Sequence, residues 1–209
     1  MEDTLVVFDF DNTLFRTKQF WREYVFTAFE GLEISHAIVE EAFVEATEKK
    51  ADYFVEQFFI ESLHTRTNVS VDTLSTFFWN ILDHRDTRRW FFEGAVDLVT
   101  RTRAKYPSCI LVTYGDQTFK EKFFVSCGIS TYFSHEETII TTTPKVALVD
   151  TWKEFGRIVF INDVLTETMS VIERCTELGI LIKAFVVTEE SVPDDERYIH
   201  VRSLSDIRL

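Results

Sequence analysis

Short, largely apolar runs recur along the chain. They span Leu5–Phe8, Cys109–Thr113, Thr138–Thr141, Ile158–Ile161 and Ala184–Val187. A strand that is buried on both faces of a parallel sheet has this continuous pattern, whereas a half-buried strand alternates apolar and polar residues. The runs therefore predict five buried, parallel strands.

Helical patterns lie between the later runs. Residues 94–107 repeat apolar side chains at helical spacing and stop at Pro107, and residues 166–179 do the same up to Gly179. Proline and glycine are common just after the end of a helix. Strands that alternate with helices indicate an α/β protein with a parallel sheet.

The stretch from about Thr17 to Phe92 contains no strand-like run. Its apolar residues repeat at helical spacing in three patterns, and Ser70 is a good N-cap for the last of them. The patterns cover residues 20–32, about 35–63, and 71–82. In the first pattern the apolar stripe comprises Trp21, Val25, Ala28 and Leu32. We therefore expect an α/β core domain, residues 1–16 and 93–209, interrupted after its first strand by a helical domain, residues 17–92.

Composition adds two constraints. Of the 209 residues, 45% are hydrophobic and 27% charged, as in an ordinary globular protein, but 21 are phenylalanine, which predicts an aromatic-rich interior. The formal net charge of -13 argues against nucleic acid as a partner, because phosphate backbones are bound by clustered Lys and Arg. Small phosphorylated substrates need only a few local positive groups, so they stay open.

The three cysteines, Cys109, Cys127 and Cys175, are widely spaced and form no CxxC pair. We interpret them as small buried side chains in a protein of a reducing compartment. The N-terminal sequence lacks the basic start of a signal peptide, and no apolar stretch has the length of a membrane span. These features predict a cytoplasmic protein without a membrane partner. We also expect a monomer or a weak homodimer.

Polar residues follow four of the predicted strands. Because ligands bind at the carboxyl ends of parallel strands, these residues are candidates for a functional site. They are Asp9 and Asp11 after the first strand, Thr113, Tyr114, Gly115 and Asp116 at the second, Lys145 after the third, and Asn162, Asp163 and Glu167 at the fourth. Each one alone has an ordinary explanation, such as a helix cap. Four strand ends that together supply carboxylates, a hydroxyl group and an amine favour a chemical site.

Asp9 and Asp11 lie two residues apart, so on an extended strand their side chains face the same way until the chain turns. Two charges about 4 Å apart repel each other by roughly 4 kcal/mol at an effective dielectric constant of 20. Asp163 adds to this cost, so the site needs a cation, and hard oxygen ligands suit Mg²⁺. Thr113, the main-chain amides after it and Lys145 would hold an anion opposite the metal. A phosphate group there would be in line for attack by a carboxylate.

The segment DFDNTLF, Asp9–Phe15, resembles the first motif of the haloacid dehalogenase (HAD) superfamily, DxDx[TV]. Thr113 matches the second motif of that family, Lys145 the third, and Asn162-Asp163 with Glu167 the fourth. The order and spacing of the motifs agree over the whole α/β core, and the helical insert lies where the C1 cap of the family lies. The resemblance implies a Rossmann-like three-layer core with a central parallel sheet, plus an α-helical cap inserted after the first strand.

The resemblance also implies a role for each matching residue. Asp9 would be the nucleophile that forms an aspartyl-phosphate, and Asp11 the general acid/base. Lys145 would offset the charge on Asp9 and on the phosphoryl group. The Mg²⁺ ligands would be Asp9, Asp163 and the main-chain carbonyl of Asp11, with Glu167 acting through water or a hydrogen bond. The phosphate-binding residues would be Thr113, Tyr114, Gly115 and Lys145.

Three residues depart from the common form of these motifs. Tyr114 stands where many relatives have a small or amide residue, Asn162 where glycine is common, and Glu167 where Asp is more common. Tyr114 would alter the phosphate pocket, and Glu167 would change how directly that acid reaches the metal. None of the three removes a group that the mechanism requires.

Asp11 indicates the type of reaction. Dehalogenase members of the family lack an acid at this position, because an alkyl halide needs no protonated leaving group. We therefore expect a Mg²⁺-dependent phosphatase that acts on a small phosphorylated metabolite, with a cap that closes over the core and sets specificity. A phosphomutase, which uses the same residues, and a weakly catalytic binding or regulatory module on a HAD scaffold are the alternatives.

The insert contains two further groups of polar residues. The histidines His36, His64 and His84 match no metal-ligand spacing, and we expect them to be solvated or capping side chains. The arginines Arg85, Arg88 and Arg89 lie near the return of the chain to the core. They either reach an anionic substrate or form a solvated basic patch, and we favour the patch.

Overall fold

The computed structural model of the chain describes residues 3–49, 53–83 and 89–209. These residues group into two compact units, which we call the sheet unit and the helical unit. The sheet unit comprises Met1–Arg16, Phe91–Tyr114 and Ser130–Leu209. The helical unit comprises Thr17–Trp90 and Gly115–Ile129. The sequence pattern assigns residues 115–129 to the core region, whereas their contacts lie with the helical residues.

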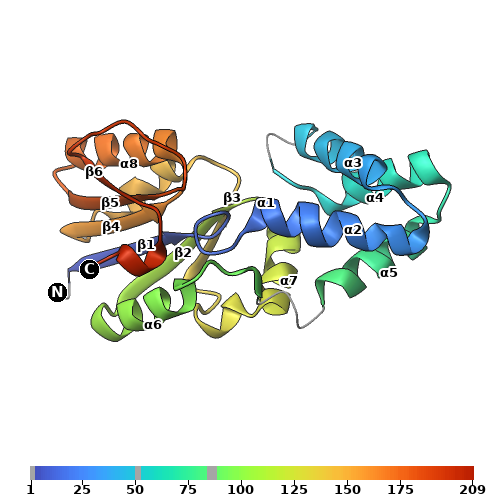
Figure 1. Ribbon diagram of the computed structural model, residues 1–209. Coiled ribbons are helices and arrows are strands. Elements are labelled where there is room, and N and C mark those ends of the chain that lie inside the picture. Colours follow the sequence, from blue (N-terminus) through green and yellow to red (C-terminus); the bar gives the residue numbers. More distant parts are fainter. Residues whose placement is uncertain (1–2, 50–52, 84–88) are drawn as a thin grey trace. The chain divides into compact units, whose positions relative to one another are not determined.

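The sheet unit contains a six-stranded parallel sheet with the strand order β3-β2-β1-β4-β5-β6 (Figure 1). The strands are β1 (Thr4–Asp9), β2 (Ser108–Tyr114), β3 (Thr138–Thr141), β4 (Arg157–Asn162), β5 (Leu181–Val187) and β6 (Tyr198–Val201). The five apolar runs of the sequence coincide with the first five strands, which confirms the prediction of a parallel α/β sheet.

Both faces of the sheet are covered, and this explains why the strands do not alternate in polarity. Leu5 and Val7 of β1 pack on one face with α8 (Leu165–Glu177) and with the 3₁₀ helix η5 (Lys145–Trp152). The helix α6 (Ala95–Lys105) lies on the other face (Figure 1). Gly179, with φ +71°, follows α8 where the sequence predicts its end.

The segment after β1 is helical, as predicted, but its first helix is irregular. It consists of α1 (Thr17–Gln19), the π-helix η1 (Phe20–Val25), α2 (Phe26–Ala28) and the 3₁₀ helix η2 (Phe29–Leu32). The predicted stripe is therefore wrong in its second half: Trp21 and Val25 are buried, but Ala28 and Leu32 are only half-buried. Phe26 and Phe29 are buried instead, because a π-turn adds a residue and shifts the inward-facing positions.

The predicted helical pattern over residues 35–63 is also corrected. It forms two helices that pack against each other, α3 (His36–Glu48) and α4 (Glu56–Thr67). The third pattern is confirmed as α5 (Val71–Leu82), and the hydroxyl group of its N-cap residue Ser70 accepts a hydrogen bond from the Thr73 amide at 3.2 Å.

Aromatic side chains form the interior of the helical unit. The ring of Trp21 lies 4.7 Å from the rings of both Phe43 and Phe54, between centroids. Phe119, on α7 (Gln117–Cys127), lies 4.8 Å from Phe54. These contacts join α7 to the helical unit, and they account for part of the high phenylalanine content.

The three cysteines are buried and carry free thiols, as predicted. Two further short 3₁₀ helices are η4 (Ile129–Thr131) and η6 (Leu204–Asp206). None of the helices formed by the described residues is long and apolar enough to cross a membrane.

Candidate active site

The candidate site lies at the carboxyl edge of the sheet, around the end of β1. Asp9 is the last residue of β1, and its neighbours β2 and β4 supply Thr113 and Asn162. The chain leaves β1 toward β2 and β3 on one side, and β4 and β5 extend the sheet on the other. Such a switch in strand order is where parallel sheets bind ligands.

A tight loop follows β1 and separates the two aspartates. Asn12 adopts the left-handed conformation, with φ +56°, and its amide donates to the Phe15 carbonyl at 2.7 Å. The amides of Leu14 and Phe15 both donate to the Phe10 carbonyl at 3.0 Å, and the rings of Phe10 and Phe15 stack. This folded loop, fixed by buried phenylalanines, gives the side chains of Asp9 and Asp11 different partners.

Asp9 is a buried carboxylate with two strong donors. Its side chain accepts a hydrogen bond from the Thr13 hydroxyl and another from the Lys145 ammonium group, each at 2.7 Å. Asp9 is only 4% exposed. Burial raises the pKa of Asp9, the charge of Asp11 adds to the rise, and the attraction of Lys145 does not cancel it.

Asp11 is held from the neighbouring strand. The hydroxyl group of Thr113, which is fully buried on β2, donates to an oxygen of the Asp11 carboxylate at 2.8 Å. Thr113 is therefore a direct partner of the predicted general acid/base. The sequence motifs predict that Thr113 binds phosphate, and they do not predict its hydrogen bond to Asp11.

Lys145 connects three of the strand ends. Besides Asp9, its ammonium group donates to Glu167 at 2.7 Å and to the Asn162 side-chain oxygen at 3.3 Å. Burial alone would lower the pKa of Lys145, but Asp9 and Glu167 together outweigh this effect and raise the pKa. Lys145 is thus a protonated, buried cation.

Glu167 and Asn162 complete the environment of Lys145. The second oxygen of Glu167 accepts from the Lys145 main-chain amide at 3.4 Å, and the side-chain amide of Asn162 donates to Glu167 at 3.1 Å. Glu167 therefore acts here through hydrogen bonds to Lys145. Asn162, which replaces the more common glycine, supplies a polar group to this network.

Asp163 carries a strongly perturbed carboxyl group. Burial, followed by the negative charge of Asp9, raises the pKa of Asp163 to about 7. Thr13 approaches Asp163 as well, at 3.4 Å. Among the described side chains, no three His, Cys, Asp or Glu residues are gathered closely enough to hold a metal ion by themselves. A cation here would need main-chain or water oxygens in addition to carboxylates.

The residues that follow Thr113 at the end of β2 have different roles. Tyr114 is half-buried at the end of β2. At Gly115, φ is +153° and an added Cβ atom would lie 2.9 Å from the Lys120 side chain, so the position favours glycine. Asp116 is the N-cap of α7, because its carboxylate accepts from the Phe119 amide at 2.8 Å. The ordinary explanation holds for Asp116.

The histidines and arginines of the insert show structural contacts. The His36 ring forms a hydrogen bond with the Arg22 carbonyl at 3.0 Å, and the His64 ring forms one with the Val69 carbonyl at 2.8 Å. The Arg89 guanidinium group lies over the rings of Tyr24 and Trp90. The predictions for His84, Arg85 and Arg88 lie outside the described residues.

Thr13 is the site residue that the sequence analysis did not single out. It is fully buried and donates to Asp9. Its place in the DxDx[TV] pattern was the available signal, but a threonine at that position has no evident chemical task in the sequence. Its partner becomes visible only once the loop after β1 is folded.

No protein-family model matches the chain, and no curated protein matches it in sequence. Solved structures do match. A haloacid dehalogenase-like hydrolase, so described, from Burkholderia xenovorans has a TM-score of 0.73 at 15% identity, covering 99% of this chain and 95% of its own. A HAD-like family hydrolase from Xanthomonas campestris has a TM-score of 0.59 at 17% identity, covering 97% and 91%. A HAD-hydrolase from Bacillus subtilis, solved with bound magnesium, has a TM-score of 0.54 at 15% identity, covering 97% and 95%.

These matches extend over nearly the whole chain, and they establish its fold. The protein has the α/β fold of the haloacid dehalogenase-like hydrolases, with a six-stranded parallel sheet. The fold that the four sequence motifs imply is thereby confirmed. At sequence identities of 15–17%, these matches show the fold and not the activity.

Proposed function

We propose that the protein is a phosphatase of the HAD superfamily that hydrolyses the phosphate monoester of a small metabolite. The observation that carries this proposal is the arrangement around Asp9. A buried carboxylate at the end of the central strand touches Thr13 and Lys145, and a second carboxylate, Asp11, is held by Thr113.

The two aspartates have separate tasks in this reaction. A carboxylate oxygen of Asp9 attacks phosphorus, and the bond from phosphorus to the leaving oxygen breaks as Asp11 donates a proton to that oxygen. Asp11 then accepts a proton from a water molecule whose oxygen attacks phosphorus. The bond between phosphorus and Asp9 breaks, inorganic phosphate leaves, and both side chains return to their first state.

The neighbouring residues orient these groups. Lys145 fixes one oxygen of Asp9 and neutralises part of the charge that gathers during transfer, and Glu167 with Asn162 holds Lys145 in place. Thr113 orients Asp11, and with the main-chain amides of Tyr114 and Gly115 it would also bind the phosphate group.

The donor set fits a magnesium ion. Asp9 and Asp163 are buried acids whose pKa values are raised, so the site carries negative charge that the protein alone does not compensate. Their carboxylates and the main-chain carbonyl of Asp11 would be the protein ligands, all of them hard oxygen atoms. When bound, magnesium supplies positive charge that favours the ionised carboxylates and the phosphoryl oxygens. The Bacillus subtilis protein of the same fold contains magnesium, which supports this assignment.

The presence of Asp11 favours a phosphate monoester over an alkyl halide as the substrate. Displacement of a halide needs no proton donor, whereas an alkoxide leaving group does. The hydrogen bond from Thr113 holds the carboxylate of the half-buried Asp11, which supports this role. We assign the helical unit to the role of a cap that contributes substrate specificity, as the position of its first segment directly after β1 suggests.

The substitution Asp9→Asn tests the proposal. We expect it to abolish the Mg²⁺-dependent hydrolysis of p-nitrophenyl phosphate, because an amide is a poor nucleophile, while the circular dichroism spectrum stays that of the parent. Asp97→Asn, on an exposed side chain of α6, is the matched control and should retain activity. Hydrolysis by Asp9→Asn at the parent rate would rule out the mechanism.

Two further outcomes separate the alternatives. If the parent protein hydrolyses none of a broad panel of phosphorylated metabolites with Mg²⁺, the proposal fails in favour of a binding module. If a bisphosphorylated sugar yields an isomeric sugar phosphate and no inorganic phosphate, the enzyme is a phosphomutase.

A further inference from the structure

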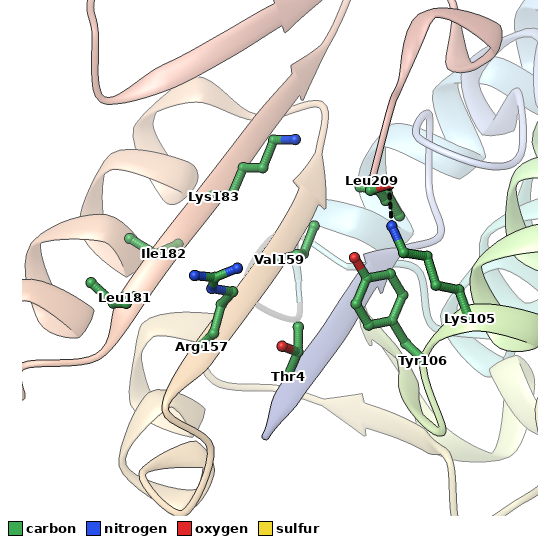
Figure 2. A pocket seen from close by; sticks show the side chains of 9 residues that line it. All are labelled: Thr4, Lys105, Tyr106, Arg157, Val159, Leu181, Ile182, Lys183 and Leu209. Atoms are coloured by element: carbon green, nitrogen blue, oxygen red, sulfur yellow. Dashed lines mark hydrogen bonds between the residues drawn. The ribbon is translucent and has the colours of Figure 1, made fainter. Parts of the chain in front are cut away.

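A hollow, which we call the basic hollow, lies at the edge of the sheet opposite to the candidate active site. It has a volume of about 560 Å³, and residues at the amino ends of β1, β4 and β5 line it (Figure 2). Its size is within the range of small-molecule sites, roughly 300–1,000 Å³. Thr4 lines the hollow while Asp9 ends the same strand, so about 17 Å of strand separates it from the catalytic carboxylates, at ~3.3 Å per residue.

The strand register brings the floor of the hollow together. Thr4 pairs with Arg157, Arg157 pairs with Leu181, and Val159 pairs with Lys183. Because side chains two residues apart share a face, all five of these side chains lie on one face of the sheet. Figure 2 shows them opposite Lys105, Tyr106 and Leu209, which form the facing wall.

This part of the sheet is less covered than the other face. Ile158, which points to the α8 side, is fully buried, whereas Leu181 on the side of the hollow is 62% exposed. Arg157 and Lys183 are exposed as well. Val159 and Tyr106 supply buried apolar surface beside them. The hollow therefore offers an apolar floor that is open to a ligand.

The charge of the hollow is opposite to that of the whole protein. The chain carries 35 acidic and 22 basic residues, yet three of the nine side chains lining the hollow are basic and none of the nine is acidic. The basic side chains are those of Lys105, Arg157 and Lys183. A cluster of one sign in a concave surface attracts ligands of the opposite charge.

The three cations are available to a ligand to different degrees. Lys105 donates to the main-chain oxygen of Leu209 at 2.5 Å, and Lys183 donates to that of Arg208 at 2.8 Å. Each ammonium group keeps two further N–H groups. The Arg157 guanidinium group forms neither an ion pair nor a hydrogen bond with any side chain or carbonyl that the structure describes. Its planar N–H groups suit a carboxylate or a phosphate.

We propose that the basic hollow binds a small organic anion, namely a carboxylate or phosphate group on an apolar body. Arg157 pairs with the anionic group, Lys183 and Lys105 stand at its sides, and the apolar body lies on Leu181, Val159 and Tyr106. This site is separate from the proposed active site and does not depend on its chemistry.

Methyl NMR spectra of the full chain test this proposal. Octanoate and hexyl phosphate are titrated while the methyl signals of Val159 and Leu181 are followed, with octan-1-ol and inorganic phosphate as probes that lack one half of the ligand. We expect saturable shifts of both signals with at least one organic anion, and much weaker binding of the alcohol and of inorganic phosphate. The comparison of octanoate with hexyl phosphate identifies the preferred anionic group.

Two variants make the test specific. Arg157→Gln should weaken binding of the organic anion by roughly tenfold to hundredfold, the value of a charge-assisted hydrogen bond. Arg202→Gln removes an equal charge from an exposed position just after β6 and should leave the affinity unchanged. Phosphatase activity should be that of the parent in both variants. The proposal is overturned if no organic anion gives saturable shifts up to about 10 mM, if octan-1-ol binds as well as octanoate, or if Arg157→Gln has no effect.

Discussion

At the scale of single residues, the candidate site is a balance of buried charges. One ammonium group, that of Lys145, lies 2.7 Å from both Asp9 and Glu167, yet the pKa of Asp9 is still raised by burial. The motif pattern predicted Asp9 and Lys145 as site residues. It did not predict that Glu167 would bind Lys145, because that contact depends on how η5 and α8 pack.

Removing the charge of Lys145 should therefore destabilise the fold. Lys145→Met keeps much of the side-chain volume but leaves buried carboxylate oxygens of Asp9 and Glu167 without a donor. We expect the metal-free protein to lose about 3–5 kcal/mol of unfolding free energy, measured by urea denaturation with a chelator. Lys153→Met, at an exposed lysine, should cost less than about 0.5 kcal/mol. Equal losses in the two variants would show that the buried contacts are unimportant.

Thr13 should act by positioning Asp9. Thr13→Val replaces the hydroxyl group that donates to Asp9 by a methyl group of similar size. We expect a loss of about 1.5–3 kcal/mol in stability, the value of a hydrogen bond to a charged group, and a lower kcat for p-nitrophenyl phosphate with little change in KM. Thr13→Ser restores the hydroxyl group and should recover most of kcat. A serine variant as slow as the valine variant would assign Thr13 to packing alone.

At the scale of elements, local patterns predicted the regular segments well and the irregular ones poorly. The five strands and α5 follow from continuous or 3.6-residue periodicity. The π-helix η1 does not follow from such a pattern, because an added residue per turn leaves no local signal in the sequence. Packing of the side chains of Trp21 and Phe26 stabilises this helix. The break between α3 and α4 was missed because the apolar spacing continues across it.

The N-cap of α7 gives a prediction at this scale. Asp116 follows the second strand, as a catalytic residue would, but its carboxylate caps α7. Asp116→Ala should lower stability by about 1 kcal/mol, and Asp116→Ser, which can cap, by much less. Thermal unfolding followed by circular dichroism measures both. Hydrolysis of p-nitrophenyl phosphate should persist in each variant, and its loss would place Asp116 in the chemistry.

At the scale of the whole molecule, the order of the four motifs along the chain predicted the fold better than the pattern of any single helix or strand. Four polar strand ends in sequence implied one sheet edge. The structure joins Asp9, Lys145 and Asn162 by hydrogen bonds, and the hydrogen-bonded pair Thr113 and Asp11 lies close enough for the charge of Asp11 to raise the pKa of Asp9. The grouping of residues 115–129 with the helical unit was not predictable, since it rests on contacts of Phe119 with Trp21 and Phe54, distant in the sequence.

The charge of the site links metal binding by the whole protein to pH. In the metal-free protein the fold raises the pKa of Asp163 to about 7, from the value of 3.8 for an aspartate side chain outside the fold. The folded state therefore binds more protons than the unfolded state between about pH 4 and 7, so this group favours folding as the pH falls and disfavours it as the pH rises. Magnesium needs the ionised carboxylate, and below pH 7 it has to displace the proton.

We therefore expect the apparent affinity for Mg²⁺ to rise with pH up to about 7 and to level off above it. At about pH 5.5 a group with a pKa near 7 is roughly 97% protonated, which weakens binding roughly 30-fold relative to pH 8.

Isothermal titration calorimetry in two buffers of different ionisation enthalpy should also detect release of close to one proton per ion at pH 5.5 and little at pH 8. Asp163→Asn should reduce both effects, leaving only the contribution of Asp9, whereas Asp150→Asn, on an exposed side chain, should keep them in full. Because the formal charge of -13 attracts cations unspecifically, the measurements need salt near 0.15 M, where exposed charges are screened over about 8 Å. An affinity that does not change between pH 5.5 and 8 would remove Asp163 from the metal site.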